Sequence, residues 1–175
     1  CNKHKLDFMV DHIFGIPGEE VREQLEAAKF YNNFKPVRVG NFWLVYYPGT
    51  EIINTALKMK LLNKNDIQKK ENGYITNYHS GGSVKNKSLI KSFENFAVFF
   101  LLIPLLPKRL NKKLLNSKLI YSLHLLPFPV RTALDFVGGL MHWDHDTISF
   151  SKYYLKFVIR ILFMKIARLR YIIFQ

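Results

Sequence analysis

Residues 11–19 have the composition of a ligand-binding turn at the end of a strand. Asp11 lies within a short apolar run, and a carboxylate in such surroundings needs a partner. Gly15 and Gly18 would let the backbone approach a ligand closely, and Pro17 would fix the turn between them. The segment therefore predicts a binding site, although the same Gly-Pro-Gly pattern could serve only as a turn.

A second polar group, His142-Trp143-Asp144-His145-Asp146, places four potential metal ligands or acid–base groups within five residues. Their spacing matches no metal site with a clear physical logic. Asp144 and Asp146 can equally begin the last helix, with Asp146 or Thr147 as its N-cap. We therefore favour the helix start and predict no metal ligand in the chain.

Hydrophobic periodicity indicates the elements that would position the first segment. Residues 6–14 form a short apolar run that ends at a Gly/Pro cluster, which is typical of a buried strand. Val21, Leu25 and Ala28 then recur at helical spacing. A second strand is predicted for residues 37–46, followed by a short helix capped by Thr50. This order indicates parallel βα units, whose ligands gather at the carboxyl ends of the strands.

The rest of the chain differs in composition. Residues 66–88 are polar with glycine breakers, which predicts a connector. Beyond it, both apolar and basic residues follow helical patterns over 89–106, 110–126, 130–141 and 150–174. We predict an α/β fold in three parts: βα units over 1–65, a connector over 66–88, and an α-helical extension over 89–175.

With these elements in place, the sequence resembles a known family. The segment Asp11-His12-Ile13-Phe14-Gly15-Ile16-Pro17-Gly18-Glu19 is followed, one strand later, by Tyr47-Pro48-Gly49-Thr50. This pair is similar to the later strands of the radical S-adenosylmethionine (radical SAM) barrel, where a D-x-I-x-G-x-P-G-E strand-turn-helix precedes a strand ending in P-G-T. The resemblance covers roughly residues 5–65. It implies the C-terminal βα units of a radical SAM partial TIM barrel, followed by the helical extension.

The resemblance also implies cofactor-binding residues. Because alternate side chains of a strand share a face, Asp11 and Ile13 should point away from His12. In the family, the position matched by Asp11 lies near the ribose of S-adenosylmethionine, and that matched by Ile13 lines the adenine. Phe42 and Leu44 share a face of the second strand and could close the adenine side, although ordinary barrel packing explains them equally well. The turn would contribute Gly15, Ile16, Pro17 and Gly18.

The cluster motif that defines the family, C-x-x-x-C-x-x-C, is absent, and the single cysteine is Cys1. In the family this motif holds a 4Fe-4S cluster through three thiolates. The resemblance therefore implies a fragment of a radical SAM enzyme that is inactive alone, with its cluster ligands outside the chain and its catalytic residues unknown. The extension is similar to the C-terminal tails of radical SAM proteins with a cobalamin-binding domain, which adds cobalamin as a candidate cofactor.

The net charge of +13 belongs to the second part of the chain. Residues 1–56 contain six Lys/Arg and seven Asp/Glu, whereas residues 57–175 contain twenty and six. Such a basic, aromatic-rich part could meet phosphate in nucleic acid or in lipid headgroups. No nucleic-acid-binding module is recognisable, so a nucleic-acid partner is disfavoured.

The arrangement of the apolar and basic residues favours a membrane surface. The apolar run 96–106 is shorter than the ~20 residues that span a bilayer, so an interfacial or buried helix is expected. Lys152, Lys156 and Arg160 recur every four residues in the last segment, which indicates peripheral membrane contact or a helix packed on the barrel with a solvated basic face. We expect a cytoplasmic protein, peripheral on the inner face of the membrane, that acts on a small-molecule or lipid-like substrate. The competing hypothesis is a non-catalytic membrane-surface or interaction module on a βα scaffold.

Overall fold

The structure is a computed structural model that describes residues 7–73, 81–142, 147–149 and 153. The chain divides into two compact units, residues 1–138 and 139–175. The described part is mixed α/β, with a two-stranded parallel sheet and a large excess of helix. The predicted α/β class is therefore confirmed.

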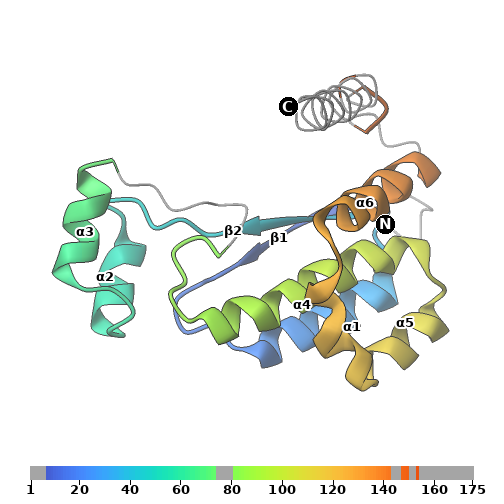
Figure 1. Cartoon of the computed structure of the whole chain (residues 1–175), viewed down its shortest axis with the longest axis horizontal. Helices are drawn as coiled ribbons and strands as arrows, with labels where there is room; N and C mark the ends of the chain where they lie inside the picture. The colour runs from blue at the N-terminus through green and yellow to red at the C-terminus, as the bar shows by residue number, and fades with distance from the viewer. Residues whose placement is uncertain (1–6, 74–80, 143–146, 150–152, 154–175) are drawn as a thin grey trace, which may run out of the picture. The chain divides into compact units, whose positions relative to one another are not determined.

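The described elements follow the predicted strand, helix, strand, helix order and then become helical throughout (Figure 1). Each strand of the sheet is followed by a helix, α1 after β1 and α2 after β2. The elements are β1 (Met9–Phe14), α1 (Val21–Phe34), β2 (Arg38–Trp43), α2 (Glu51–Lys58), α3 (Lys64–Glu71), α4 (Lys87–Leu105), α5 (Lys108–Leu115), the 3-10 helix η2 (Lys118–Leu125) and α6 (Phe128–Met141).

The sheet is amphipathic, so the prediction of a buried strand over residues 6–14 was wrong for one face of β1. β1 and β2 pair in parallel, with α1 as the connection between them. Phe14 and Trp43 lie on the face that packs against α1 and α4, where both are buried. Ile13 and Phe42 lie on the opposite face, where each remains nearly half exposed. We call the face that carries Met9, Asp11, Ile13, Gly40 and Phe42 the open face.

The main hydrophobic core is centred on α4. Its side chains Phe93, Phe99, Phe100 and Ile103 are fully buried, and they pack with Phe14 of β1. Among the described residues, α4 is also the one helix whose length and apolar composition would allow it to cross a membrane. In this fold that apolar character fills the core, which agrees with the buried alternative expected for residues 96–106.

A smaller cluster lies where α2 and α3 meet the segment after β2. It contains Tyr46, Ile53, Ala56 and Leu62, all buried, with Leu44 packed against them. Asn63 starts α3 with a capping box, in which its side chain accepts from the Asp66 N–H and the Asp66 carboxylate accepts from the Asn63 N–H. Part of the predicted connector is therefore a capped helix.

Lys35 and Asn111 satisfy the carbonyl groups that end α4. Pro104 lies inside the last turn, where its ring nitrogen has no proton to donate. Lys35 Nζ donates to the carbonyl oxygens of Ile103 and Leu106, the latter at 2.6 Å. Asn111 Nδ2 donates to the same two oxygens at 3.2 Å. A lysine from the α1–β2 loop thus fixes the end of the core helix.

Replacing Lys35 with methionine should lower the free energy of unfolding by about 1–2 kcal/mol. The two carbonyl groups would lose a charged donor and keep only the Asn111 amide. Urea denaturation followed by circular dichroism measures the change. Lys29→Met, at a lysine with an exposed side chain on α1, is the control and should be close to neutral. Equal stability of the two variants would contradict this role of Lys35.

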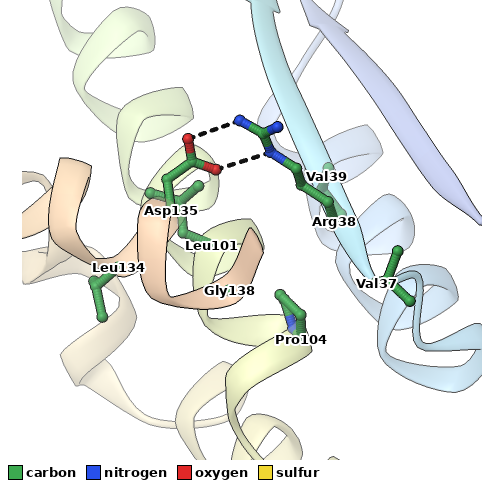
Figure 2. Close-up of a pocket in the computed structure, with 8 residues that line it drawn as sticks. All are labelled: Val37, Arg38, Val39, Leu101, Pro104, Leu134, Asp135 and Gly138. Carbon is green, nitrogen blue, oxygen red and sulfur yellow. Dashed lines mark hydrogen bonds and ion pairs between the residues drawn. The ribbon is translucent and has the colours of Figure 1, made fainter. Parts of the chain in front are cut away.

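An ion pair joins α6 to β2 (Figure 2). Arg38 Nε lies 3.2 Å from Asp135 Oδ1 and Arg38 Nη2 lies 3.0 Å from Asp135 Oδ2, so the guanidinium contacts both carboxylate oxygens. Beside the pair is a cavity of about 10 Å³ lined by Leu101, Pro104 and Leu134 among others. Such a space accommodates about one water molecule, and it offers no room for a ligand.

Three local predictions were wrong in detail. Residues 110–126 form two helices because Ser117 interrupts them: its Oγ accepts from the Leu119 N–H and caps η2. The second strand ends at Trp43. Thr50 occupies the N-cap position of α2 as predicted. Its hydroxyl, however, donates to the carbonyl oxygen of Tyr47 and accepts no hydrogen bond from the first N–H groups of the helix. Of the predicted helix 150–174, all but Tyr153 lies outside the described residues.

Candidate functional site

The structure brings three of the predicted site residues together on the open face. Asp11 and Ile13 lie two residues apart on β1, and Phe42 lies on β2. The strand register pairs Ile13 with Phe42 and Asp11 with Gly40. Ile13 is 46 % exposed and Phe42 is 49 % exposed, so both offer apolar surface to a ligand. A carboxylate and two apolar side chains therefore form one continuous surface.

Gly40 makes room for the Asp11 carboxylate. A Cβ atom at position 40 would lie 2.8 Å from Asp11 Oδ1, closer than real Cβ atoms approach a neighbour, and 3.0 Å from Phe42 Cε2, which is a tight contact. The Asp11 side chain thus lies across Gly40 toward β2. Among the described residues, the Asp11 carboxylate has no hydrogen-bond or ion-pair partner. Gly40 could not be recognised from the sequence alone, because its role depends on the pairing of the two strands.

The turn after β1 is held by Glu19. Its Oε2 accepts hydrogen bonds from the backbone N–H groups of Gly15, at 2.6 Å, and Ile16, at 3.2 Å. The carbonyl oxygen of Gly15 accepts from the Tyr46 hydroxyl at 2.6 Å. These backbone groups are therefore already satisfied within the protein. They shape the edge of the open face, and they are not free to bind a ligand.

Both glycines of the turn have structural reasons of their own. Gly15 has φ +90° and Gly18 has φ +83°, a region that other residues rarely adopt. A Cβ at position 15 would meet Val84 Cγ2 at 2.9 Å, and one at position 18 would meet Met59 Cε at 2.6 Å. The turn alternative that the sequence left open is thus sufficient to explain Gly15 and Gly18. Ile16, at the tip between them, is exposed, and Pro17 is half-buried.

Leu44 does not join the open face as predicted. It continues the pairing of β2, with its N–H donating to the Phe14 carbonyl at 2.8 Å and its carbonyl accepting from the Ser83 N–H at 3.0 Å. Its side chain packs against the smaller cluster around Tyr46. The packing alternative therefore describes Leu44, while Phe42 remains available to a ligand.

A hydrogen-bond network lies behind the site, on the covered face of β1. His12 Nε2 is 2.8 Å from Gln24 Oε1, and His12 Nδ1 is 2.9 Å from the Tyr31 hydroxyl. Gln24 Nε2 donates to Glu19 Oε1 at 2.6 Å, so Gln24 Oε1 accepts a hydrogen bond from His12 Nε2–H. Because its pKa is lowered, His12 is neutral at neutral pH, and its Nδ1 then accepts from the Tyr31 hydroxyl. We call these four residues the His12 network.

The electrostatics of the His12 network follow from burial. Burial lowers the pKa of His12 from its ordinary value of 6.5, against a smaller opposite effect of the Gln24 hydrogen bond. Burial raises the pKa of Glu19, which the hydrogen bonds from Gly15, Gln24 and Ile16 partly offset. Burial also raises the pKa of Tyr46 to about 12, with a further contribution from Glu19. The hydrogen bonds of the network therefore join β1 to α1 and to the turn, and His12 takes part in them in its neutral form.

Within the part of the chain that the structure describes, no group of three or more His, Cys, Asp or Glu side chains is placed to hold a metal ion. Of the His142–Asp146 segment, only His142 is described, so the predicted helix start at residues 144–147 is largely outside the described residues. Cys1 is outside them as well.

Comparison of the chain with models of known protein families, with characterised proteins and with solved structures finds no match.

Proposed function

We propose that this chain is part of a radical SAM enzyme and supplies the wall of the pocket that contacts the nucleoside of S-adenosylmethionine. The observation that carries the proposal is the open face, where the Asp11 carboxylate, which has no partner among the described residues, lies beside the exposed side chains of Ile13 and Phe42. The D-x-I-x-G-x-P-G-E resemblance adds the family. Strand, turn and helix lie in the order that the family has.

The residues of the open face fit a nucleoside. A ribose carries two vicinal hydroxyl groups that can donate to a carboxylate, and such charge-assisted hydrogen bonds are strong. An adenine ring offers flat apolar area that matches Ile13 and Phe42, and ligand sites of this kind combine apolar walls with few polar groups. Gly40 keeps the surface between the two strands shallow enough for the Asp11 carboxylate to face the ligand.

When bound beside a 4Fe-4S cluster, S-adenosylmethionine supplies the radical chemistry of this family. The described residues offer no ligand set for such a cluster, so under the proposal it is held by residues outside them. Asp11, Ile13 and Phe42 would bind and orient the nucleoside. A cobalamin cofactor and a small-molecule or lipid-like substrate belong to the same proposal, and we assign no described residue to either.

Asp11→Asn is expected to weaken S-adenosylmethionine binding by roughly tenfold, because the loss of a charged acceptor costs about 1.5 kcal/mol. Isothermal titration of the protein encoded by the complete reading frame, purified without oxygen, measures the dissociation constant. Ile13→Asp should weaken binding further, since it replaces apolar surface with a second carboxylate.

Asp7→Asn is the matched control, because Asp7 is also exposed but lies before the start of β1, away from Ile13 and the turn. It should leave the dissociation constant unchanged. Two results would overturn the proposal: no binding of S-adenosylmethionine by the wild-type protein, or equal binding by Asp11→Asn and wild type. Iron and sulfide analysis of the same preparation tests the cluster separately.

A further inference from the structure

Four large apolar side chains of η2 and the start of α6 lie in solvent. Leu119 is 66 % exposed, Tyr121 63 %, Leu125 71 % and Phe128 79 %. Single exposed apolar residues are ordinary on protein surfaces, but these four fall within ten consecutive residues. We call these four side chains, together with Lys108, Lys112, Lys113 and Lys118, the η2 surface.

The 3-10 geometry of η2 explains why its apolar residues divide into two sets. With three residues per turn, side chains three apart lie above one another. Ile120 and Leu123 lie on the inner line and pack against the main core. Leu119 and Leu125 lie two turns apart on an outer line, and Tyr121 lies on the third line beside them. The segment therefore has more apolar residues than its core contact uses.

Side-chain hydrogen bonds hold this segment in place. Asn95 Oδ1, on the core helix α4, accepts from both the backbone N–H and the Nδ1 of His124 at 2.9 Å. Arg131 of α6 donates from Nε to the Leu126 carbonyl at 2.8 Å and from Nη2 to the His124 carbonyl. The outward direction of Leu125 and Phe128 is thus fixed by residues on both sides of them.

The charged residues of α5 and η2 all have one sign. Residues 95–134 contain no Asp or Glu, although they contain six Lys/Arg. Five of these basic residues precede Leu119, and each of the five is exposed: Lys108, Arg109, Lys112, Lys113 and Lys118. α5 packs against η2, so its basic residues lie on an element next to the exposed apolar ones. Apolar anchors beside cations alone are the combination that binds anionic bilayers.

We propose that the η2 surface docks on an anionic lipid membrane, with Leu119, Tyr121, Leu125 and Phe128 inserted among the headgroups and the α5 lysines contacting lipid phosphates. The absence of acidic residues from α5 and η2 argues for a phosphate-rich surface, because a second copy of this basic segment would repel it. The proposal is independent of S-adenosylmethionine binding. It concerns residues different from the segment 150–174, which the sequence analysis indicated.

Flotation of the full chain with lipid vesicles tests the proposal. The wild type should bind vesicles of phosphatidylcholine mixed with phosphatidylglycerol, and added salt should weaken this binding. The double variant Lys112→Gln, Lys113→Gln should bind roughly thirtyfold more weakly, since each cation near the surface contributes about a factor of five. Leu125→Ser with Phe128→Ser should lose at least about tenfold, because two apolar side chains no longer leave water.

Matched substitutions elsewhere separate docking from general effects. Lys58→Gln with Lys64→Gln removes two exposed cations on α2 and α3, and Phe30→Ser removes an exposed phenylalanine of α1. These controls should bind vesicles like the wild type, and circular dichroism melting checks that every variant is folded. Failure of the wild-type chain to bind anionic vesicles would overturn the proposal. So would binding that survives both η2-surface variants, or sedimentation showing that those substitutions only break a dimer.

Discussion

Phe100→Ala is expected to lower the free energy of unfolding by about 3–5 kcal/mol, the usual cost of a large cavity at a buried phenylalanine. Phe100 is fully buried in α4. Its ring centroid lies 5.2 Å from that of Tyr31 and 5.9 Å from that of Phe14, so it contacts both α1 and β1. It also lies 4.7 Å from the His12 ring. Loss of this ring therefore loosens the core helix, the strand and the His12 network together.

Urea denaturation gives the change directly. Phe100→Leu keeps most of the apolar volume and should cost clearly less than Phe100→Ala. Phe30→Ala, at a phenylalanine 55 % exposed on α1, is the matched control and should cost well under half as much. If Phe100→Ala and Phe30→Ala proved equally stable, α4 would not be the centre of the core.

Gln24→Leu is expected to cost about 2–4 kcal/mol, although leucine is the more apolar residue. Gln24 is fully buried and is both acceptor for His12 Nε2 and donor to Glu19 Oε1. Its removal leaves two partly buried polar groups without their partners, each costing about 1–3 kcal/mol. The Glu19 carboxylate would then hold the turn at Gly15 less firmly. Thermal and urea unfolding measure the loss, and Gln68→Leu on the exposed surface of α3 is the control.

The same network predicts how stability depends on pH. The pKa of His12 is lowered in the fold, so in acid the unfolded chain takes up a proton that the folded chain does not. The contribution of a neutral His12 is fully present above pH 6.5 and is lost as the pH falls below that value toward the folded pKa. Glu19 acts oppositely: its raised pKa favours the fold below pH 4.5, and this is lost as the pH rises. The two windows run toward each other, from pH 6.5 downward and from pH 4.5 upward, and the two effects on stability have opposite signs.

The difference between wild type and His12→Gln isolates this effect, because the other histidines contribute equally to both. Between about pH 7.5 and pH 5.5 the wild type should lose more stability than His12→Gln. A parallel pH dependence of the two proteins would mean that the pKa of His12 is the same in the folded and the unfolded chain, which would contradict the effect of burial described above.

The structural features that could be predicted from the sequence are those that depend on residues close together along the chain. Val21, Leu25 and Ala28 recur at helical spacing, and Ala28 is fully buried where α1 meets the core. The alternation of Ile13 with Phe14 correctly placed these two side chains on opposite faces of β1, although the apolar run had predicted a buried strand. Both patterns are local, since one element and its period fix which residues share a face.

Features that depend on pairing between elements could not be predicted in this way. The fit of Asp11 over Gly40 follows from the strand register, which the two strands determine together. Leu44 has the right spacing for the open face and continues the pairing of β2, yet its side chain packs against the smaller cluster around Tyr46. Gln24 did offer a signal, because it shares the apolar stripe of α1 with Val21 and Ala28. A polar residue in such a stripe indicates a buried hydrogen-bond partner.

Ligand binding at the open face is thermodynamically linked to folding. Ile13 and Phe42 leave apolar area in water, so whatever covers them adds its own binding free energy to that of the native state. A ligand that binds only the folded chain raises the free energy of unfolding by RT ln(1 + [L]/Kd). The melting temperature of the protein should therefore report occupancy of the face, and its rise with ligand concentration would measure affinity without any assay of turnover.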